Sequence, residues 1–563
     1  MMRHGLFYLL PRLSWVPLVT ALALPGCYLG PDSSERELEE GDSNGAGGEG
    51  AGGEDSSQDS TDDGSEGEGE SEGGCSDVVD LPLRRLSNEE YRRSVVDLFG
   101  VDVPEVKNFP LDEKSGQFPA NWQTALGAQN LTGYMEAAEA VSKRVLKATP
   151  KYFQSCEEVD PAEQDDCVTA NLRDFLTRAY RRTPETDELQ RMLDFYQSSL
   201  SEWGEKDADR MFIETVLLAP QFLYVTPPYA GNEQQSFASR LSYFLTGGPP
   251  DAPLIELAEA GELSNEVTLE AEVDRLLNSD RTVGSLPELL VNLMSMDRLD
   301  ATDQKTSASW SNGLRNDMRR ETYEFIRMVI ENEGGLHEML TSRETLLNQR
   351  LAKIYGVEEQ HTGEGWEKLM LPEGARAGLL TQASFLTGHS HSKETSWVLR
   401  GRFIRENLLC TDLPPPPPNL DQSVPNDSGR LDNPECAACH RLMDPIGAAF
   451  DRYDALGRYA ETLKDGTEIP SSGEVVEADQ ALDISGTFTS PVALIERMGE
   501  SESVRRCVAR QFYRFAQRRR EREEESCQVT EMMDSFLETD GDFTALMRTI
   551  ALSPSFVAFE RDQ

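Results

Sequence analysis

The sequence predicts a mainly α-helical protein of serial helical modules, with an embedded c-type haem module and a disordered acidic tether near the N-terminus. Apolar residues recur at helical spacing from residue 83 onward, whereas alternating strand patterns are scarce. A CxxCH motif lies late in the chain, and residues 28 to 74 are almost wholly Gly, Ser, Asp and Glu. Because 563 residues are too many for one core, we expect several domains.

Residues 1–26 have the composition of an export signal. Arg3 and Arg12 supply positive charge, and an apolar run from Leu13 to Leu24 is too short to span a bilayer with these flanks. The run leads into Leu24-Pro25-Gly26-Cys27, which resembles a bacterial lipobox, although a small residue is more usual than Pro25. We expect cleavage before Cys27 and lipid on its thiol. An ordinary secretory signal with an incidental Cys27 is the alternative.

Lipid on Cys27 would anchor the chain to a membrane without spanning it, in the periplasm or at the cell surface. Tyr28 stands where resemblance to bacterial lipoproteins would put Asp as an inner-membrane retention signal, so we favour the outer membrane. No later apolar run is long enough to predict a second membrane segment.

Residues 27–80 are predicted to be a tether between the lipid and the folded body. Arg36 is the only positive charge between residues 28 and 74, and such a segment cannot bury enough apolar surface to offset its ordering entropy. The whole chain has a formal net charge of −46. That charge argues against a nucleic-acid partner, because phosphate binding needs a basic face.

Capping signals and apolar stripes predict the helices of the body. Ser87 and Glu90 form a capping box, Gly100 ends that helix, and Thr183-Pro184 begins a later one. The stripes expected in the core are Tyr91, Val95, Leu98 and Phe99; Tyr134, Ala138, Val141 and Val145; Val168, Leu172, Phe175 and Ala179; and Leu189, Met192, Leu193 and Tyr196.

The helical pattern continues over residues 213–224, 237–244, 267–277 and 318–331. A short β element is expected within 472–490, and Pro414 to Pro418 predict a stiff polyproline spacer. Near the C-terminus, we expect Phe512, Phe515 and Ala516 on an apolar helix face. Four arginines are expected to form a solvated face that pairs with the acidic residues of 521–525, namely Arg518, Arg519, Arg520 and Arg522.

Cys436-Ala437-Ala438-Cys439-His440 has the spacing of covalent haem c attachment. Two thiols one helical turn apart can each add to a haem vinyl group, and the adjacent histidine can bind the iron as proximal ligand. A redox pair or half of a zinc site are the alternatives. Zinc usually requires a second Cys or His pair, and the chain has no second CxxC and no HxxxH.

Several residues are candidates for the ligand on the second face of the iron. Met443 is three residues after His440, so in a helix it would lie on the same side of the haem and be a poor distal ligand. Pro445 predicts that no long regular helix runs through this point. His389 is our first distal candidate and His391 the second; Met498 and Met370 are alternatives. Packing of His389 as a plain polar residue, or an open iron site, are the other interpretations.

Nine cysteines allow a disulfide framework in an exported protein. Lipidation of Cys27 and haem attachment would leave six. The short separations favour Cys156–Cys167 and Cys507–Cys527, which leaves Cys75–Cys410 as the remaining pair. Buried reduced thiols are the alternative for all six.

Seven segments of the chain have a familiar sequence, and they begin with LRRLSNEEYRRSVVDLFG. They span residues 83–100, 175–184, 214–224, 237–263, 378–418, 436–459 and 552–559. In this order they resemble secreted bacterial cytochrome-like proteins built from consecutive domains of unknown function 1587, 1595, 1592, 1588 and 1585.

The resemblance implies five modules, at 81–148, 156–228, 233–362, 375–475 (the haem module) and 485–560. It also implies haem attachment at Cys436 and Cys439 with His440 as proximal ligand, and it places a family histidine at His389. Ser396-Trp397-Val398 stands where Ser-Pro-Val is usual, which leaves the local turn open.

The sequence therefore favours a membrane-tethered monohaem protein that transfers electrons, or the haem part of an exported oxidoreductase, with a redox protein as partner. A haem enzyme with an open iron site is one alternative, because the helical body is larger than a haem carrier needs. No acid/base or nucleotide-binding motif supports that reading. A scaffold lipoprotein with a structural haem or metal is the other. The sequence predicts neither an oligomeric state nor a substrate.

Overall fold

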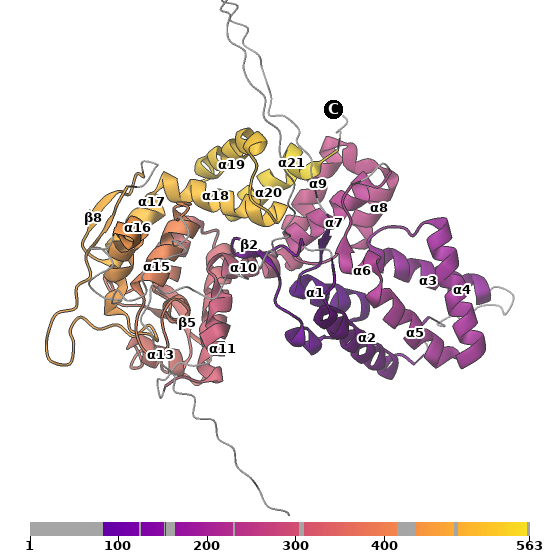
Figure 1. Cartoon of the computed structure of the whole chain (residues 1–563), viewed down its shortest axis with the longest axis horizontal. Helices are drawn as coiled ribbons and strands as arrows, with labels where there is room; N and C mark the ends of the chain where they lie inside the picture. Colours follow the sequence, from indigo (N-terminus) through magenta and orange to yellow (C-terminus); the bar gives the residue numbers. More distant parts are fainter. Residues whose placement is uncertain are drawn as a thin grey trace, which may run out of the picture. The chain divides into compact units, whose positions relative to one another are not determined.

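The computed structural model describes residues 81, 83–122, 125–150, 152–153, 164–228, 231–302, 309–413, 434–477 and 482–559 (Figure 1). The predicted export signal, the whole of the predicted tether with Cys27, and the polyproline segment lie outside these residues. The chain divides into two units: Met1–Glu70 with Pro414–Arg441, and Ser71–Leu413 with Leu442–Gln563. The second unit, called the body below, holds nearly all described elements. It is mainly helical, as expected.

The first part of the body is a group of helices around one hydrophobic core. Its elements are β1 (Arg84–Arg85), α1 (Asn88–Phe99), η1 (Pro104–Asn108), β2 (Lys114–Ser115), β3 (Phe118–Pro119), α2 (Ala128–Ala148), α3 (Gln164–Tyr180), α4 (Thr186–Trp203), α5 (Glu205–Leu218), α6 (Pro220–Leu223) and β4 (Tyr224–Val225). The core runs from Leu86 to Val225 and takes in Tyr243. Helices α2, α4 and α5 pack against one another within it.

The larger part of the body surrounds a second core, which runs from Phe237 to Val557 and takes in Phe118. Its helices up to residue 408 are α7 (Glu233–Thr246), α8 (Ala252–Ala260), η2 (Glu262–Ser264), α9 (Glu266–Leu277), α10 (Asp280–Leu293), η3 (Met296–Thr302), α11 (Asn312–Glu331), α12 (Leu336–Thr341), α13 (Gln349–Tyr355), η4 (Leu379–Thr381), α14 (Ala383–Gly388), α15 (Trp397–Phe403) and the π-helix η5 (Ile404–Leu408). Those after it are α16 (Pro434–Ala448), η6 (Ala449–Arg452), α17 (Pro491–Glu500), α18 (Glu502–Gln517), η7 (Glu523–Glu525), α19 (Ser526–Glu538), α20 (Phe543–Leu552) and α21 (Pro554–Val557). Helix α16 belongs to the body only from Leu442 onward.

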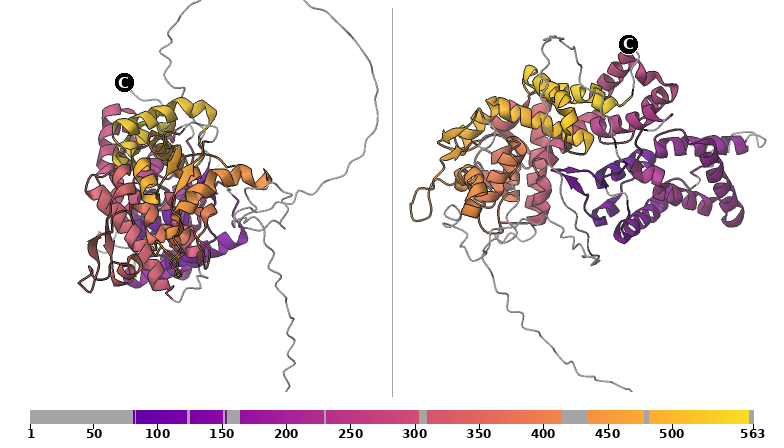
Figure 2. Two further views of the ribbon diagram at one scale, coloured as in Figure 1. Left: turned by 90° about the vertical axis from the view of Figure 1, so that its left-hand side faces the viewer. Right: turned by 45° about the horizontal axis from the view of Figure 1, so that its top comes forward.

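The C-terminal helices return to the middle of the chain. Helix α20 packs on α9, and α17 packs on α12. Figure 1 and the right-hand view of Figure 2 show the yellow C-terminal helices beside the pink helices α7 and α9. The predicted serial modules therefore share two cores, because segments of this size bury too little surface alone.

The strands described form four two-stranded antiparallel sheets, β1–β4, β2–β3, β5–β6 and β7–β8. Strands β5 (Glu344–Leu347) and β6 (Glu367–Met370) belong to the larger part. Strands β7 (Gly473–Val475) and β8 (Gly486–Phe488) confirm the β element expected within 472–490.

The first predicted helix is confirmed in detail. Ser87 accepts from the backbone of Glu90, the carboxylate of Glu90 accepts from Ser87, and Gly100 ends α1 with a φ of 67°. The predicted stripes are buried at most positions; Phe99, Val168, Met192 and Leu193 are half-buried. The helix expected over 213–224 is interrupted at Ala219, because Pro220 begins α6 as its first residue.

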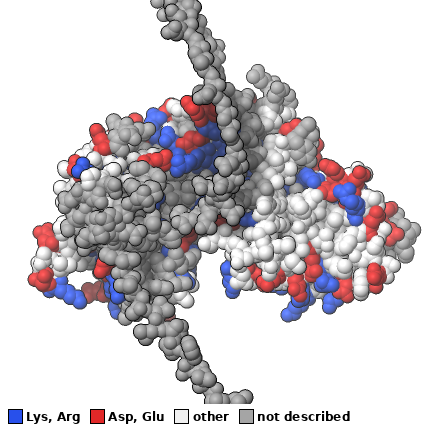
Figure 3. Space-filling view, in the orientation of Figure 1, with Lys and Arg blue, Asp and Glu red and all other residues white. Residues whose placement is uncertain are grey.

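The expectation of four solvated arginines is wrong for Arg518. This residue ends α18 with a φ of 56°, which turns its side chain into the body, where it is 7% exposed and bonds Glu90. Arg519 pairs with Glu525 as expected, whereas Arg520 pairs with Asp412. Figure 3 shows acidic and basic side chains intermixed over the described part of the visible face.

Two predicted disulfides are wrong, because Cys410 is bonded to Cys507. Their Cα atoms are 5.4 Å apart, although 97 residues separate them in sequence. Cys507 lies in the second turn of α18 and faces η5. About 15 Å of helix separate it from the end of α18, and only after that end does the chain turn toward α19 and Cys527. This excludes both Cys507–Cys527 and Cys75–Cys410. Cys167 and Cys527 are themselves disulfide-bonded, and Cys75 and Cys156 lie outside the described residues, so Cys156–Cys167 stays a prediction.

Candidate haem-attachment helix

Helix α16 carries the whole CxxCH motif. Cys436 and Cys439 are three residues apart and His440 is four after Cys436, so all three lie within an arc of roughly 100° on one helix face. Cys436 and His440 are buried and Cys439 is half-buried. Neither cysteine is joined in a disulfide. Two thiols and one imidazole on one face are the donor set that covalent haem attachment needs, so these residues fit the group.

Met443 follows on this same helix face, about 60° around from His440. A side chain on the proximal helix cannot reach the opposite face of an iron bound by His440. Because this stretch is helical, Met443 would lie on the same side of the haem as His440 and would be a poor distal ligand.

The expected break at Pro445 is wrong, since α16 continues to Ala448. Proline removes one helical hydrogen bond, here the bond that would accept at the carbonyl of Arg441. The helix ends three residues later, so few turns are disturbed. Nearby, Nε of the buried Arg405 donates to the carbonyl of Leu442 at 2.7 Å.

Two glycines fix the second half of α16 against α15. A Cβ on Gly401 of α15 would collide with the backbone of Met443, and a Cβ on Gly447 of α16 would collide with the backbone of Trp397. The two helix backbones therefore touch at both crossing points. This contact fixes residues 442–448, and the motif occupies the preceding turns of the same helix.

The start of α15 resolves the unusual Ser-Trp-Val sequence. Ser396 caps the helix by accepting from the backbone of Leu399, and Trp397 is the first helical residue. Proline is favoured at this position, so tryptophan replaces it without changing the helix start. The indole of Trp397 also donates to Asp451 at 2.7 Å.

Arg400 connects α15 to the segments around it. Its guanidinium is fully buried and donates to four carbonyls, those of Leu386, Phe450, Tyr453 and Asp454, at 2.7 to 3.2 Å. The side chain of Arg400 therefore bonds both the end of α14 and the chain that follows α16. Burial lowers the pKa of Arg400 to about 10, which leaves it charged at neutral pH.

Arg376 and Arg405 act in the same way. Arg376 donates to the carbonyls of Thr381 and Gly457 and lies between the rings of Tyr355 and Tyr453, 4.6 and 4.9 Å from their centroids. Arg405 bonds the carbonyls of Leu442 and Val476. Sequence reasoning missed these three arginines. Their only signal was a set of charges inside otherwise apolar stretches such as WVLRGRFIREN.

Nε2 is the ring nitrogen of His389 that could bind a metal. His389 caps α14, is 3% exposed, and packs against the rings of Phe385 and Phe403 at 4.4 and 4.8 Å. Nδ1 lies 3.0 Å from the carbonyl of Phe385, which can only accept, so the proton is on Nδ1. Burial, with a smaller effect from Arg298, holds the pKa of His389 well below its usual range. A neutral imidazole whose Nδ1 is bonded to a backbone carbonyl has the arrangement typical of iron-ligating histidines.

The other distal candidates have different surroundings. Met370 is 53% exposed on β6, and Met498 is fully buried in the larger core. His391 is half-buried, and its backbone N–H donates to the carbonyl of Glu394. Since the motif and these residues belong to different units, the identity of the distal ligand stays a prediction.

Within the described ranges, no group of three or more His, Cys, Asp or Glu side chains is arranged to hold a metal ion. No helix in the part of the chain that the structure describes is long and apolar enough to cross a membrane.

Comparison with protein families gives five matches, each to a protein of unknown function. In chain order they are DUF1587 at residues 84–147, DUF1595 at 167–226, DUF1592 at 233–357, DUF1588 at 376–463 and DUF1585 at 486–556. Helix α16 lies inside the DUF1588 match. No curated protein and no solved structure matches the chain. The five matches in this order show that the chain belongs to the family built from the DUF1587, DUF1595, DUF1592, DUF1588 and DUF1585 domains.

Proposed function

We propose that this chain is an exported, membrane-tethered c-type haem protein that transfers electrons, alone or as the haem part of an oxidoreductase. One observation carries the proposal: Cys436, Cys439 and His440 share one face of one helix. Haem bound there would supply one-electron chemistry at its iron. The thiols would hold the group covalently and the imidazole of His440 would bind the metal.

His389 is our proposed second axial ligand. Its burial, its aromatic neighbours and the bond from Nδ1 to Phe385 all favour a fixed, neutral ring whose Nε2 can donate a lone pair. Two strong ligands suit electron transfer, whereas an open position suits ligand activation. The haem enzyme is therefore the second candidate, and His389 is the residue that separates the two.

The visible spectrum of the chain, produced together with cytochrome c maturation machinery, tests the axial ligation. We expect a low-spin spectrum that carbon monoxide does not change, and a reversible one-electron reduction. His389→Ala should convert the iron to high spin and allow carbon monoxide to bind. His361→Ala is the matched control, because His361 bonds the carbonyl of Gly365 on a different segment. A spectrum unchanged by His389→Ala would remove His389, and His391→Ala would then test the second candidate.

The export signal supports a location in the periplasm or at the cell surface, with lipid on Cys27 and an electron-accepting or electron-donating protein as partner. Metabolic labelling with a fatty acid tests the anchor. We expect label on the wild-type chain and none on Cys27→Ser, with Cys167→Ser as a labelled control. Label that persists in Cys27→Ser would contradict the lipobox.

A further inference from the structure

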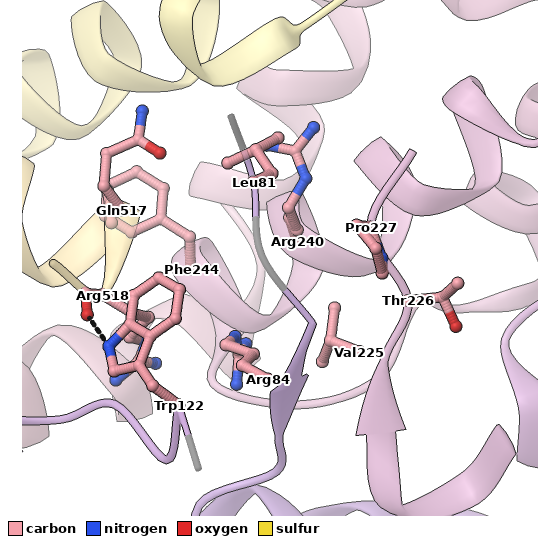
Figure 4. A pocket seen from close by; sticks show the side chains of 11 residues that line it. Leu81, Arg84, Trp122, Val225, Thr226, Pro227, Arg240, Phe244, Gln517 and Arg518 are labelled. Carbon is pink, nitrogen blue, oxygen red and sulfur yellow. Dashed lines mark hydrogen bonds between the residues drawn. The ribbon is translucent and has the colours of Figure 1, made fainter. Parts of the chain in front are cut away.

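Among the described residues, a small cavity in the body is lined by three arginines and by no acidic side chain. It measures about 30 Å³, and its charged residues are Arg84 of β1, Arg240 of α7 and Arg518 at the end of α18. Trp122 and Phe244 form part of its wall (Figure 4). Thr226 and Pro227 also line it and are half-buried, so the cavity is open to solvent. It brings together residues from the DUF1587, DUF1595, DUF1592 and DUF1585 matches.

Glu90 is bonded by two of the three arginines. Glu90 accepts from Arg84 at 2.7 and 3.1 Å and from Arg518 at 2.9 Å. Although burial works in the opposite direction, the two guanidinium groups lower the pKa of Glu90 to about 2. Glu90 is therefore ionised at neutral pH, and it balances one of the three positive charges.

Of the three arginines, Arg240 is the one that pairs with no carboxylate among the described residues. It donates to the carbonyls of Phe556 and Val557 at 2.5 and 3.3 Å, and its Nε is buried without a hydrogen-bond partner. Burial, with a contribution from Arg84, lowers the pKa of Arg240 to about 9. A cation in apolar surroundings beside another cation is unfavourable, and an anion in the cavity would offset that cost.

Gln517 adds a fixed polar group at the edge of the cavity. Its Nε2 donates to the carbonyl of Ser555 at 3.1 Å, which orients the amide and leaves Oε1 buried without a donor. Such an acceptor suits a water molecule or hydroxyl group that enters together with an anion.

We propose that this cavity is a binding site for a small carboxylate, with Arg240 as its main contact. The planar guanidinium matches the two oxygens of a carboxylate, and a cavity of about 30 Å³, room for roughly two water molecules, admits a small head group. The ligand is a short carboxylic acid or the carboxylate end of a longer molecule. The site uses no haem and does not rest on the proposed electron transfer.

Thermal unfolding of the full mature chain in sodium acetate, against sodium chloride at equal ionic strength, tests the proposal. We expect acetate to raise the melting temperature in a saturable manner that chloride does not reproduce. Arg240→Gln should weaken acetate binding at least tenfold. Arg548→Gln is the matched control, since Arg548 pairs with Asp274 and Glu270 outside the cavity and should keep the full response.

Equal responses to acetate and chloride would overturn the site, as would an Arg240→Gln variant that responds like the wild type. Should Arg240→Gln fail to fold, Arg240→Lys retains the charge and loses the planar fork. It is then expected to weaken acetate binding at least fivefold, measured by saturation transfer from the methyl protons of acetate. An unchanged affinity in Arg240→Lys would also contradict the assignment.

Discussion

Arg400 is fully buried and Arg240 is half-buried. Among the described residues the Nε of each is buried without a hydrogen-bond partner, yet the surroundings of the two guanidinium groups differ. Arg400 donates to four carbonyls, and the acidic neighbours Asp451 and Asp454 favour its charge. Arg240 donates to two carbonyls, and its neighbour Arg84 opposes its charge. Arg240 also lines the cavity described above.

The comparison separates two uses of a buried charge. Arg400 has enough acceptors and acidic neighbours to serve as a structural connection beside α16. Arg240 has too few acceptors for its charge and borders open space, which is the arrangement expected of a ligand contact. A buried cation alone therefore does not identify a site; its neighbours and the adjacent space decide.

The largest effect should come from removing the structural arginine. Arg400→Met should lower the free energy of unfolding by about 3–5 kcal/mol, because four buried carbonyls lose their donor. Arg402→Met is the control on the same helix, since Arg402 is 55% exposed and pairs with Glu406. Urea unfolding measures both. A loss for Arg400→Met within about 1 kcal/mol of the control would contradict the structural role.

The disulfide between Cys410 and Cys507 joins the region of Arg400 to α18, the helix that ends at Arg518. Closing a loop of this length restricts the unfolded chain, so the double variant Cys410→Ser, Cys507→Ser should lose about 2–4 kcal/mol. Peptide mapping under non-reducing conditions checks the pairing directly. A peptide linking Cys507 to Cys527 would contradict the structure.

Glu321 and Glu90 extend the comparison to buried acids. Two arginines bond Glu90, whereas Glu321 accepts from Tyr355 at 2.6 Å and Thr345 at 3.3 Å, with Arg376 acting only at longer range. Burial raises the pKa of Glu321 to about 8. Between about pH 4.5 and 8 the unfolded chain loses this proton and the folded chain keeps it, so stability falls as the pH rises.

Glu321→Gln should remove that pH dependence. Urea unfolding should show no advantage of the variant near pH 4, and an advantage of about 3–5 kcal/mol at pH 8.5. Glu90→Gln should behave in the opposite sense. The pKa of wild-type Glu90 is lowered to about 2, so its carboxylate contributes stability above about pH 4.5, and this contribution is lost as the pH falls toward 2. The variant should lack this contribution at neutral pH. An equal pH response in the two variants would be inconsistent with these assignments.

The smallest change in stability is expected for Arg240→Gln. The variant loses two hydrogen bonds and the contacts of the guanidinium with the rings of Phe237 and Phe556, but it also removes a cation whose charge Arg84 opposes. Without ligand its unfolding free energy should therefore stay within about 1 kcal/mol of the wild type. A loss as large as that of Arg400→Met would show that Arg240 is a structural connection as well.

Local signals predicted much of the fold. Ser87, Glu90 and Gly100 define α1 through contacts a few residues apart, and the apolar stripes follow from helical spacing alone. The CxxCH spacing likewise singled out Cys436, Cys439 and His440 as candidates for haem attachment, and the structure places all three on one face of α16.

Contacts between distant segments could not be predicted in this way. The bond between Cys410 and Cys507 and the pairing of Arg518 with Glu90, 428 residues away in sequence, depend on how helices pack. The same holds for Arg400, whose partners come from two other segments. Pro445 differs, because a local rule failed where the helix was about to end.

The central claim is covalent haem on α16, and intact-mass spectrometry of the chain produced with cytochrome c maturation machinery tests it most directly. The account predicts an added mass of one haem per chain, located on the peptide that contains Cys436 and Cys439. Cys436→Ser, Cys439→Ser should lack this mass, whereas Cys167→Ser should retain it. A wild-type chain without the added mass, or a double variant that keeps it, would contradict the account.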